Sequence, residues 1–271
     1  MIDCGEATQL QCKKYNVKLS KLDHIFISHL HGDHYYGLIG LLSTMHLYGR
    51  EKKITIAGPP GLRDILTLQL RYSETVLNYE IEFTEWLPNQ VETVLDHARF
   101  TVTTIPLDHR VPCSGYLITQ KPNKRRIIRE MIPKQLPPAQ INLLKNGEDV
   151  TDESGDIIYE NSEVTRPPLP AYRYAYCSDT KYKPAIIDQI KGVDMIYHEA
   201  TFMDDMEDRA GKTFHSTAKQ AASIAKSSKA DILLIGHFST RYKNLEDMGT
   251  EAQSIFPNTF LAKEGETFKV G

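Results

Sequence analysis

The sequence has no apolar run long enough to cross a bilayer, so it does not indicate a helical membrane protein. Its first six residues are polar almost at once, and we therefore expect no signal peptide. Cysteine is scarce, and the four cysteines are far apart without a CxxC pair, at Cys4, Cys12, Cys113 and Cys177. This spacing argues against a zinc finger and against a secreted disulfide scaffold, and it favours a reducing, cytoplasmic environment.

An excess of positive charge is also missing. The chain carries 32 Lys and Arg residues against 35 Asp and Glu residues, which gives a formal net charge of −3. Bulk charge therefore does not indicate a nucleic-acid binder, and any contact with RNA has to come from local basic patches. A hydrophobic content of 41% in 271 residues is typical of a globular protein with a sizeable core.

The apolar pattern predicts short strands that alternate with turns and a few helices, without an internal repeat. The sequence Thr217-x-x-Gln220 has the form of a capping box that opens an amphipathic helix. Two more helices are expected at 37–48 and 62–72. Strands are expected at 23–28, 53–57, 100–106, 115–119, 172–177, 193–197 and 232–235.

The segment 120–170 differs from the rest because it is rich in proline and has few strong apolar runs. Its first half is basic, at Lys121, Lys124, Arg125, Arg126, Arg129 and Lys134. Its second half is acidic, at Glu148, Asp149, Asp152, Glu153 and Asp156. A segment of this length within a compact domain is usually functional or disordered, and we interpret it as an inserted arm. The alternative is a solvated hairpin whose basic and acidic halves pair with each other.

The strongest chemical pattern is His29-Leu30-His31-Gly32-Asp33-His34. Three imidazoles and a carboxylate within six residues are hard to explain by packing, and these groups are ligands of divalent metals. His29 and His31 point the same way on extended backbone and can share one metal. Asp33 and His34 follow a glycine that permits a sharp turn, so they can serve a second metal.

One loop cannot complete two metal sites, and the chain offers three further candidates. His109, Asp179 and His237 each follow an apolar strand. Loops at the ends of strands converge at one edge of a sheet, where functional residues gather. A lone histidine after a strand is usually an ordinary residue, but three such candidates beside the first cluster favour metal ligation.

These residues resemble a known family. The stretch from His29 to His34 resembles the signature of the metallo-β-lactamase superfamily, and the three later candidates fall where its other ligands stand. Further stretches are similar to motifs of the ribonuclease Z family within it: Asp3-Cys4-Gly5-Glu6-Ala7-Thr8-Gln9, Gly37-Leu38-Ile39-Gly40-Leu41-Leu42, Tyr197-His198-Glu199-Ala200-Thr201-Phe202, His215-Ser216-Thr217 and Phe238-Ser239-Thr240-Arg241-Tyr242. The resemblance covers nearly the whole chain.

The resemblance implies a single metallo-β-lactamase domain over 1–271, an αββα sandwich of the α/β class with the arm 120–170 inserted in it. It implies two zinc ions, with manganese as an alternative metal, and a homodimer. His29, His31 and His109 would hold one ion, and Asp33, His34 and His237 the other, with Asp179 between the two. Zinc lowers the pKa of bound water to near 7, so a hydroxide between the metals can attack a phosphodiester in line.

The same resemblance assigns catalytic roles. Asp33 would orient the attacking hydroxide and accept its proton. His215 would donate a proton to the leaving ribose 3′-oxygen, and Glu199 would fix its tautomer. Without the resemblance, His215 is simply a residue before a helix and Glu199 a surface acid. Two roles stay open at each of two other positions: His198 supports the site or is a buried structural residue, and Arg241 contacts a phosphate or is solvated.

The expected activity is endonucleolytic removal of the 3′ trailer from precursor tRNA, which leaves a 3′-hydroxyl on the tRNA. Two alternatives are a metal-dependent phosphodiesterase that acts on other or small diesters and a catalytically weak RNA-binding relative.

Two departures from the family pattern bear on this choice. Family members begin with further strands and a basic loop before the first motif, and loss of opening strands would leave a sheet edge unpaired. The arm reads Pro137-Pro138-Ala139-Gln140, where the family usually has a Gly-Pro pair after its two prolines.

Overall fold

The computed structural model describes residues 1–270 of the chain. Its contacts divide into two compact units. The first, here called the sandwich unit, comprises residues 1–97 and 101–118 and the chain from residue 173 onward. The second, here called the arm unit, comprises residues 98–100 and 119–172, and it contains the segment expected as an arm. Within the described residues, no helix is both long and apolar enough to span a membrane.

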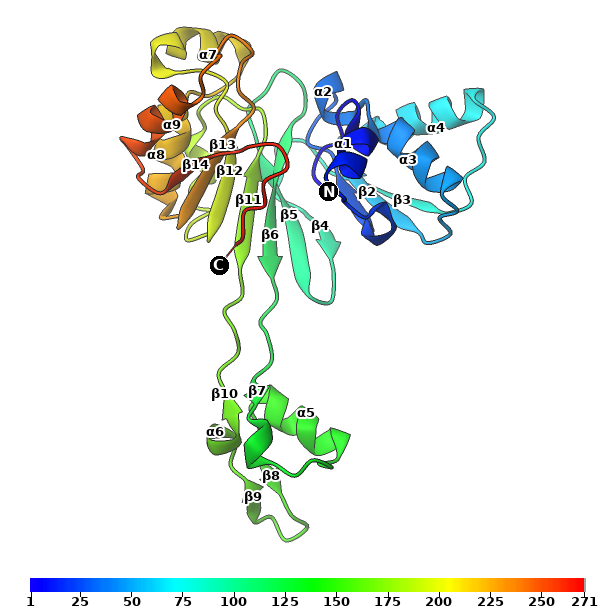
Figure 1. Cartoon of the computed structure of the whole chain (residues 1–271), viewed down its shortest axis with the longest axis vertical. Coiled ribbons are helices and arrows are strands. Elements are labelled where there is room, and N and C mark those ends of the chain that lie inside the picture. The colour runs from blue at the N-terminus through cyan, green and yellow to red at the C-terminus, as the bar shows by residue number, and fades with distance from the viewer. Residues whose placement is uncertain (271) are drawn as a thin grey trace. The chain divides into compact units, whose positions relative to one another are not determined.

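The sandwich unit has two β-sheets with helices on their outer faces (Figure 1). The small sheet is parallel and has the order β1 (His24–Phe26), β2 (Ile54–Gly58), β3 (Ile81–Glu85). The large sheet has the order β14 (Thr259–Leu261), β13 (Ile232–Gly236), β12 (Met195–Glu199), β11 (Arg173–Cys177), β6 (Ser114–Gln120), β5 (Phe100–Pro106), β4 (Thr93–Asp96). Helices α1 (Thr8–Lys14), α3 (Leu38–Leu47) and α4 (Leu62–Tyr72) lie beside the small sheet, and α7 (Glu207–Thr213), α8 (Ala218–Ser228) and α9 (Glu246–Gln253) beside the large one. This is the expected αββα arrangement.

Each sheet forms a hydrophobic core with its own helices. Beside the small sheet, the fully buried Ile25 and Ile56 pack with Leu41 of α3 and Leu66 of α4. Beside the large sheet, the core includes Ile196, Leu233, Ile235, Ala221, Ala222, Ile224 and Ala225. Burying these apolar side chains on both faces of a central pair of sheets is what makes a layered domain stable.

The capping box predicted at the start of α8 is confirmed. Thr217 Oγ1 accepts from the backbone N–H of Gln220 at 3.2 Å, and Gln220 Oε1 accepts from the backbone N–H of Thr217 at 3.0 Å. These contacts satisfy two donors that a helix start otherwise leaves unpaired. The helix end therefore holds Ser216 and His215 in a defined position just before it.

Within the sandwich unit, the strands missing from the sequence interpretation are edge strands. β3 is one edge of the small sheet, and β4 and β14 are the two edges of the large sheet. Edge strands are short and partly exposed, so they lack the apolar runs that reveal central strands. The other side of β1 is paired in part, because Ile2 forms a parallel bridge with Phe26, and the backbone N–H of Phe26 donates to the carbonyl of Met1 at 3.0 Å.

The arm unit is ordered and has a small core of its own. Its buried residues are Ile132, Leu136, Leu144, Val150 and Val164. Helix α5 (Pro138–Asn146) begins with a proline and ends at Gly147, whose φ of 95° suits the left-handed end of a helix. The unit also holds α6 (Asn161–Val164), the paired strands β7 (Arg126–Ile127) and β10 (Thr165–Arg166), and the paired strands β8 (Val150–Thr151) and β9 (Ile157–Tyr159).

Candidate active site

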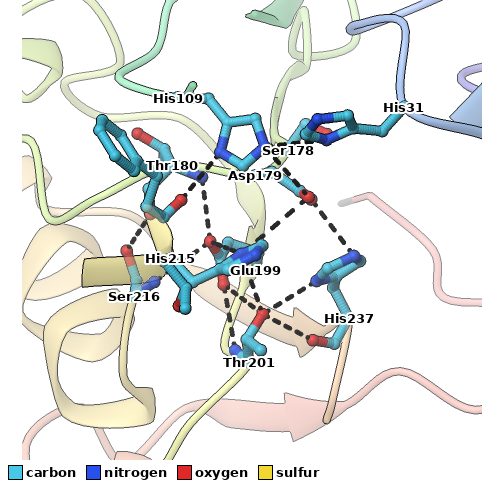
Figure 2. A network of polar contacts seen from close by, with 12 residues as sticks. His31, His109, Ser178, Asp179, Thr180, Glu199, Thr201, His215, Ser216 and His237 are labelled. Carbon is cyan, nitrogen blue, oxygen red and sulfur yellow. Dashed lines mark hydrogen bonds and ion pairs between the residues drawn. The ribbon is translucent and has the colours of Figure 1, made fainter. Parts of the chain in front are cut away.

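The parallel strands of the large sheet carry polar residues to one edge. β11, β12 and β13 are neighbours and run parallel, and Cys177 pairs with His198 while Glu199 pairs with Gly236. Asp179, Glu199 and His237 therefore lie at or just beyond three adjacent carboxyl ends. β1 delivers the loop from His29 to α2 (Gly32–Tyr35) to the same place, and the loop after β5 brings His109. Figure 2 shows several of these side chains pointing toward a shared centre.

The first ligand group consists of His29, His31, His109 and Asp179. His31 Nδ1 lies 3.1 Å from His29 Nε2 and 3.1 Å from His109 Nε2. Asp179 Oδ2 faces the same nitrogens, at 3.7 Å from His29 Nε2 and 3.9 Å from His109 Nε2. Three imidazole nitrogens and one carboxylate oxygen are the donor set of a divalent transition metal.

The second ligand group consists of Asp33, His34 and His237, with Asp179 facing it. Asp33 Oδ2 lies 3.4 Å from His34 Nε2 and 3.6 Å from His237 Nε2. The other oxygen of Asp179, Oδ1, lies 3.5 Å from His34 Nε2 and 3.4 Å from His237 Nε2. The two oxygens of one carboxylate thus face two different groups, which is the geometry of a residue shared between two metals.

Electrostatics favour cations at this place. The carboxylates of Asp3, Asp33, Asp179 and Glu199 form no ion pair with any Lys or Arg among residues 1–270, and the ion pairs that they form are with histidines. His34 Nε2 and Asp179 Oδ1 are buried without a hydrogen-bond partner in the described chain. Buried unpartnered polar atoms are costly unless something binds them. The donor set and these orphaned atoms fit a pair of divalent metals.

The pKa shifts agree with metal binding. Burial lowers the pKa of His29 to about 2, which keeps this imidazole in the neutral form that binds metals. Burial also lowers the pKa of His34, but the carboxylates of Asp179, Asp3 and Asp33 outweigh it and raise the pKa to about 12. The field of these carboxylates therefore stabilises positive charge at the second ligand group.

Four of the ligand histidines use Nδ1 for an orienting contact, and this leaves Nε2 for a metal. His29 Nδ1 lies 3.0 Å from Ser28 Oγ, and His34 Nδ1 lies 2.8 Å from Asp3 Oδ2. The other two contacts join His109 Nδ1 to the carbonyl of Phe214 at 2.9 Å and His237 Nδ1 to Thr201 Oγ1 at 2.9 Å. Such partners fix the ring orientation and the tautomer of metal-binding histidines.

Asp3 is a residue whose role the sequence interpretation missed. Its carboxylate accepts from the backbone N–H of Ser28 at 2.7 Å, from Ser28 Oγ at 2.9 Å and from the hydroxyl of Tyr176 at 3.0 Å, besides its contact with His34. Asp3 thereby joins the first motif to β11 and to the histidine loop. The motif around it marked this residue, but only the fold reveals its partners.

Two glycines let the first motif approach the histidine loop at backbone distance. A Cβ on Gly5 would lie 2.2 Å from the carbonyl oxygen of Asp33, and a Cβ on Gly37 would lie 1.8 Å from the carbonyl oxygen of Gly5. The two segments are held together by the bond from the Cys4 N–H to the His34 carbonyl at 2.7 Å. Any larger residue at either glycine would push the ligand loop away.

The expected catalytic pair is assembled beside the ligands. Glu199 is fully buried, and its Oε1 lies 3.0 Å from His215 Nδ1. The same oxygen accepts from the N–H groups of Thr180 at 2.9 Å and Ser216 at 3.1 Å, while Oε2 accepts from Thr201 Oγ1 at 2.8 Å. His215 is thereby fixed at Nδ1, and its ring lies 5.4 Å from that of His237 (Figure 2).

The structure brings together all nine residues predicted for the site. Among the ligand candidates the side chain of Asp33 is the most exposed, at 61%, and Asp179 is among the buried ones. His198 belongs to neither ligand group: its ring is buried, and its Nδ1 contacts the carbonyl of Glu199 at 2.7 Å. Arg241 bonds Ser239 Oγ at 3.0 Å and lies over the ring of Phe202, which itself contacts the ring of His215. Its guanidinium is therefore near the catalytic pair.

Comparison with known proteins agrees with this geometry. The family model described as Anti-Pycsar protein Apyc1 matches residues 1–118, which is less than half of the chain. The ribonuclease Z of Cytophaga hutchinsonii is 49% identical over 270 residues, and the match covers 100% of this chain and 86% of that relative.

Solved structures show the same fold. Human tRNase Z, short form, matches with a TM-score of 0.71 and 24% identity, over 100% of this chain and 87% of that one. The metallo-β-lactamase fold protein YhfI from Bacillus subtilis matches with a TM-score of 0.65 and 20% identity, over 98% and 85% of the two chains. Because it is 49% identical to a ribonuclease Z over 270 residues, this chain belongs to the ribonuclease Z family of metal-dependent endoribonucleases with the metallo-β-lactamase fold.

Proposed function

We propose that the protein removes the 3′ trailer from precursor tRNA by hydrolysing one phosphodiester bond and leaving a 3′-hydroxyl on the tRNA. Membership of the ribonuclease Z family is the observation that carries this proposal. The ligand groups, the pair of Glu199 and His215, and the basic first half of the arm support it. The alternative, a phosphodiesterase for small diesters, has no use for such an arm.

Two zinc ions are the proposed cofactors, with manganese as the other metal that this donor set suits. His29, His31 and His109 would hold one ion, and Asp33, His34 and His237 the other, with Asp179 shared. When bound, the ions would make a water molecule nucleophilic at neutral pH and would neutralise charge at the phosphate. The orphaned Asp179 Oδ1 and His34 Nε2 support this arrangement.

The residues of the chain supply the proton transfers. Asp33, the exposed carboxylate of the ligand set, accepts the proton of the attacking water. His215 donates a proton from Nε2 to the leaving ribose 3′-oxygen, because its Nδ1 is held by Glu199. Buried Glu199 has its other bonds to Thr180, Ser216 and Thr201, so it keeps the imidazole in one tautomer and orientation.

The arm unit is the proposed grip on tRNA. If its basic and acidic halves neutralised each other, ion pairs would join them, yet none of Lys124, Arg126, Arg129 and Lys134 forms an ion pair within residues 1–270. The acidic half is used locally instead: Asp152 Oδ1 accepts from the N–H groups of Ser154 at 2.8 Å and Asp156 at 3.0 Å. Arg126 Nε donates to the carbonyl of Pro167 at 3.2 Å, which leaves its charge without a carboxylate partner. Exposed cations without a carboxylate partner are available to backbone phosphates.

Replacement of the arm tests the function. Asn123 Nδ2 donates to the carbonyl of Leu169 at 3.2 Å, so the two chain segments at the base of the arm lie together. Residues 124–168 can therefore be replaced by a short glycine-serine turn. We expect the variant to need far more precursor tRNA for half-maximal rate while it hydrolyses bis(4-nitrophenyl) phosphate nearly as before, because the arm supplies remote binding energy and no ligand. Unchanged tRNA processing, or loss of both activities, would contradict the role of the arm.

Two further properties are proposed. The protein forms a homodimer, which the family resemblance implies. Exposed apolar residues support it: Leu10, Val17 and Tyr48 line a pocket of about 910 Å³, and Leu47 is exposed on α3. This pocket shares no residue with the ligand groups. Sedimentation of the unchanged chain and of Leu47→Asp tests the dimer.

A cytoplasmic location is supported by the four cysteines, which are all free and buried.

A further inference from the structure

A second pocket lies beside His215, outside the ligand groups. It has a volume of about 580 Å³, within the range of sites that bind small molecules or single nucleotides. Its wall includes Lys181, Tyr182, Gly211, Lys212, Phe214 and His215. Among these, His215 belongs to the catalytic pair and Phe214 orients His109 through its carbonyl, whereas the other side chains have no role in the site described above. The pocket therefore extends the site in a direction that the metals do not explain.

The pocket wall is fixed to the site on both sides. Lys181 follows closely on Asp179, and its backbone N–H donates to the carbonyl of Asp108, next to His109, at 2.9 Å. Lys181 Nζ lies 3.8 Å from the centre of the Phe214 ring. Phe214 has a φ of 63°, an unfavourable value for a phenylalanine, and its carbonyl holds His109 Nδ1. The wall is therefore preformed together with the ligands.

The chemistry of the wall suits a nucleobase better than a bare phosphate. Tyr182 lines the pocket and is 41% exposed, and an exposed aromatic ring can stack with any base. The cations of Lys181 and Lys212 are balanced by the carboxylates of Glu207 and Asp208, which also line the pocket. A simple anion site would have an excess of positive charge, which this pocket lacks.

Gly211 gives an independent indication that the pocket is kept open. It lies inside α7, where glycine is less favourable than alanine by about 1 kcal/mol. A Cβ at this position would meet no atom within 4 Å, and the backbone does not have a positive φ. Neither packing nor conformation therefore requires glycine here. The missing side chain leaves space in the pocket wall.

The position of the pocket beside His215 decides which nucleotide it receives. Cleavage that leaves a 3′-hydroxyl on the tRNA releases the 3′-oxygen of the last retained nucleotide, and His215 protonates that oxygen. We propose that this pocket holds the base of the nucleotide immediately 5′ of the cleaved bond, stacked on Tyr182. The inference rests on the proposed function and adds a positioning residue to it.

Coupling between Tyr182 and one substrate base tests the inference. Three precursor tRNAs are compared with the full-length protein: an intact one, one abasic immediately 5′ of the cleaved bond, and one abasic immediately 3′ of it. Loss of the 5′ base should lower kcat/KM of the unchanged protein about ten- to a hundredfold, since stacking on an aromatic side chain has that effect. Tyr182→Ala should lower kcat/KM on intact substrate similarly and show little further loss on the 5′-abasic substrate.

The control and rescue variants keep the test independent of folding. Tyr182→Phe should restore the sensitivity to the 5′ base, and Tyr72→Ala, which alters an exposed tyrosine on α4, should behave as the unchanged protein. The inference would be overturned if the losses of kcat/KM from Tyr182→Ala and from the 5′-abasic site were independent of each other. It would also be overturned if Tyr182→Ala were coupled to the 3′ base instead. Neither result would affect the proposed function. Failure of the unchanged protein to cleave any precursor tRNA would overturn the proposed function as well.

Filling the pocket gives a second test. Gly211→Leu should lower kcat/KM for precursor tRNA at least tenfold, while its thermal unfolding temperature should stay equal to or above that of the unchanged protein, because leucine favours the helix. Gly211→Ala, with a single added carbon, should have a smaller effect on cleavage. A fully active Gly211→Leu variant would show that no base occupies the pocket during cleavage.

Discussion

The ligand cluster and the arm use charged residues in opposite ways. In the cluster, Asp179, Glu199 and His29 are buried among other polar groups: Glu199 accepts from several donors, and Asp179 faces the ligand histidines. In the arm, Arg129 and Lys134 are exposed and form no ion pair in the described residues. Buried polar groups must be satisfied by fixed partners, whereas exposed cations are already satisfied by water and can exchange it for phosphate. A single substitution in the cluster should therefore lower activity greatly, whereas a single substitution in the arm should weaken tRNA binding only slightly.

The largest effect is expected from Asp179→Ala, which removes the carboxylate that both ligand groups share. Loss of several kcal/mol of metal-dependent stabilisation lowers the rate about 10³-fold or more. Metal content and turnover of precursor tRNA are the measurements, and Asp188→Ala, at an exposed aspartate, is the control. Full metal occupancy with normal turnover in Asp179→Ala would exclude the shared role.

A large effect is also expected from His215→Ala. Loss of a positioned proton donor typically lowers the rate about 10²–10⁴-fold. The variant should keep its metals, because the two proposed metal sites are made by other residues. It should retain more activity on a diester with a nitrophenolate leaving group, which needs no proton. His46→Ala on α3 serves as the control. Equal losses on good and poor leaving groups would remove His215 from this role.

An intermediate effect is expected from Thr201→Val, which keeps the shape of the side chain and removes its hydroxyl. That hydroxyl contacts His237 Nδ1 at 2.9 Å and donates to Glu199 Oε2 at 2.8 Å. Loss of such a supporting contact lowers metal affinity or activity about 10–100-fold. Thr201→Ser should restore both in a metal titration. If Thr201→Ser is as impaired as Thr201→Val, the methyl group and its packing are what matter.

The smallest effect is expected from single changes of the arm cations. Arg129→Gln or Lys134→Gln should weaken binding of precursor tRNA slightly and reduce the slope of log affinity against log salt by about one. Lys226→Gln, at an exposed lysine near the end of α8, is the control. The measurement is the affinity for precursor tRNA at several salt concentrations, from low to moderate. An unchanged slope in both variants would mean that these cations do not meet phosphates.

The sequence predicted the residues that bear the chemistry better than the residues that support them. Three imidazoles and a carboxylate within 29–34 are a local pattern, and His109, Asp179 and His237 were recognisable because each follows an apolar strand. Asp3, Ser28 and Thr201 were not assigned roles. Aspartate, serine and threonine are common in loops, so their residue types alone distinguish nothing.

The central strands, the helix beginning at Thr217 and the chemistry of the ligand set were determined by the sequence alone, because apolar periodicity, capping and donor type are local properties. The tertiary structure decided which atoms meet. Asp3 reaches the hydroxyl of Tyr176 across 173 positions of the chain, and Asp179 turns its two oxygens to two different groups. The pocket at Tyr182 and Gly211 is likewise made by segments distant in sequence. Such contacts depend on the packing of two sheets, and no local pattern encodes that geometry.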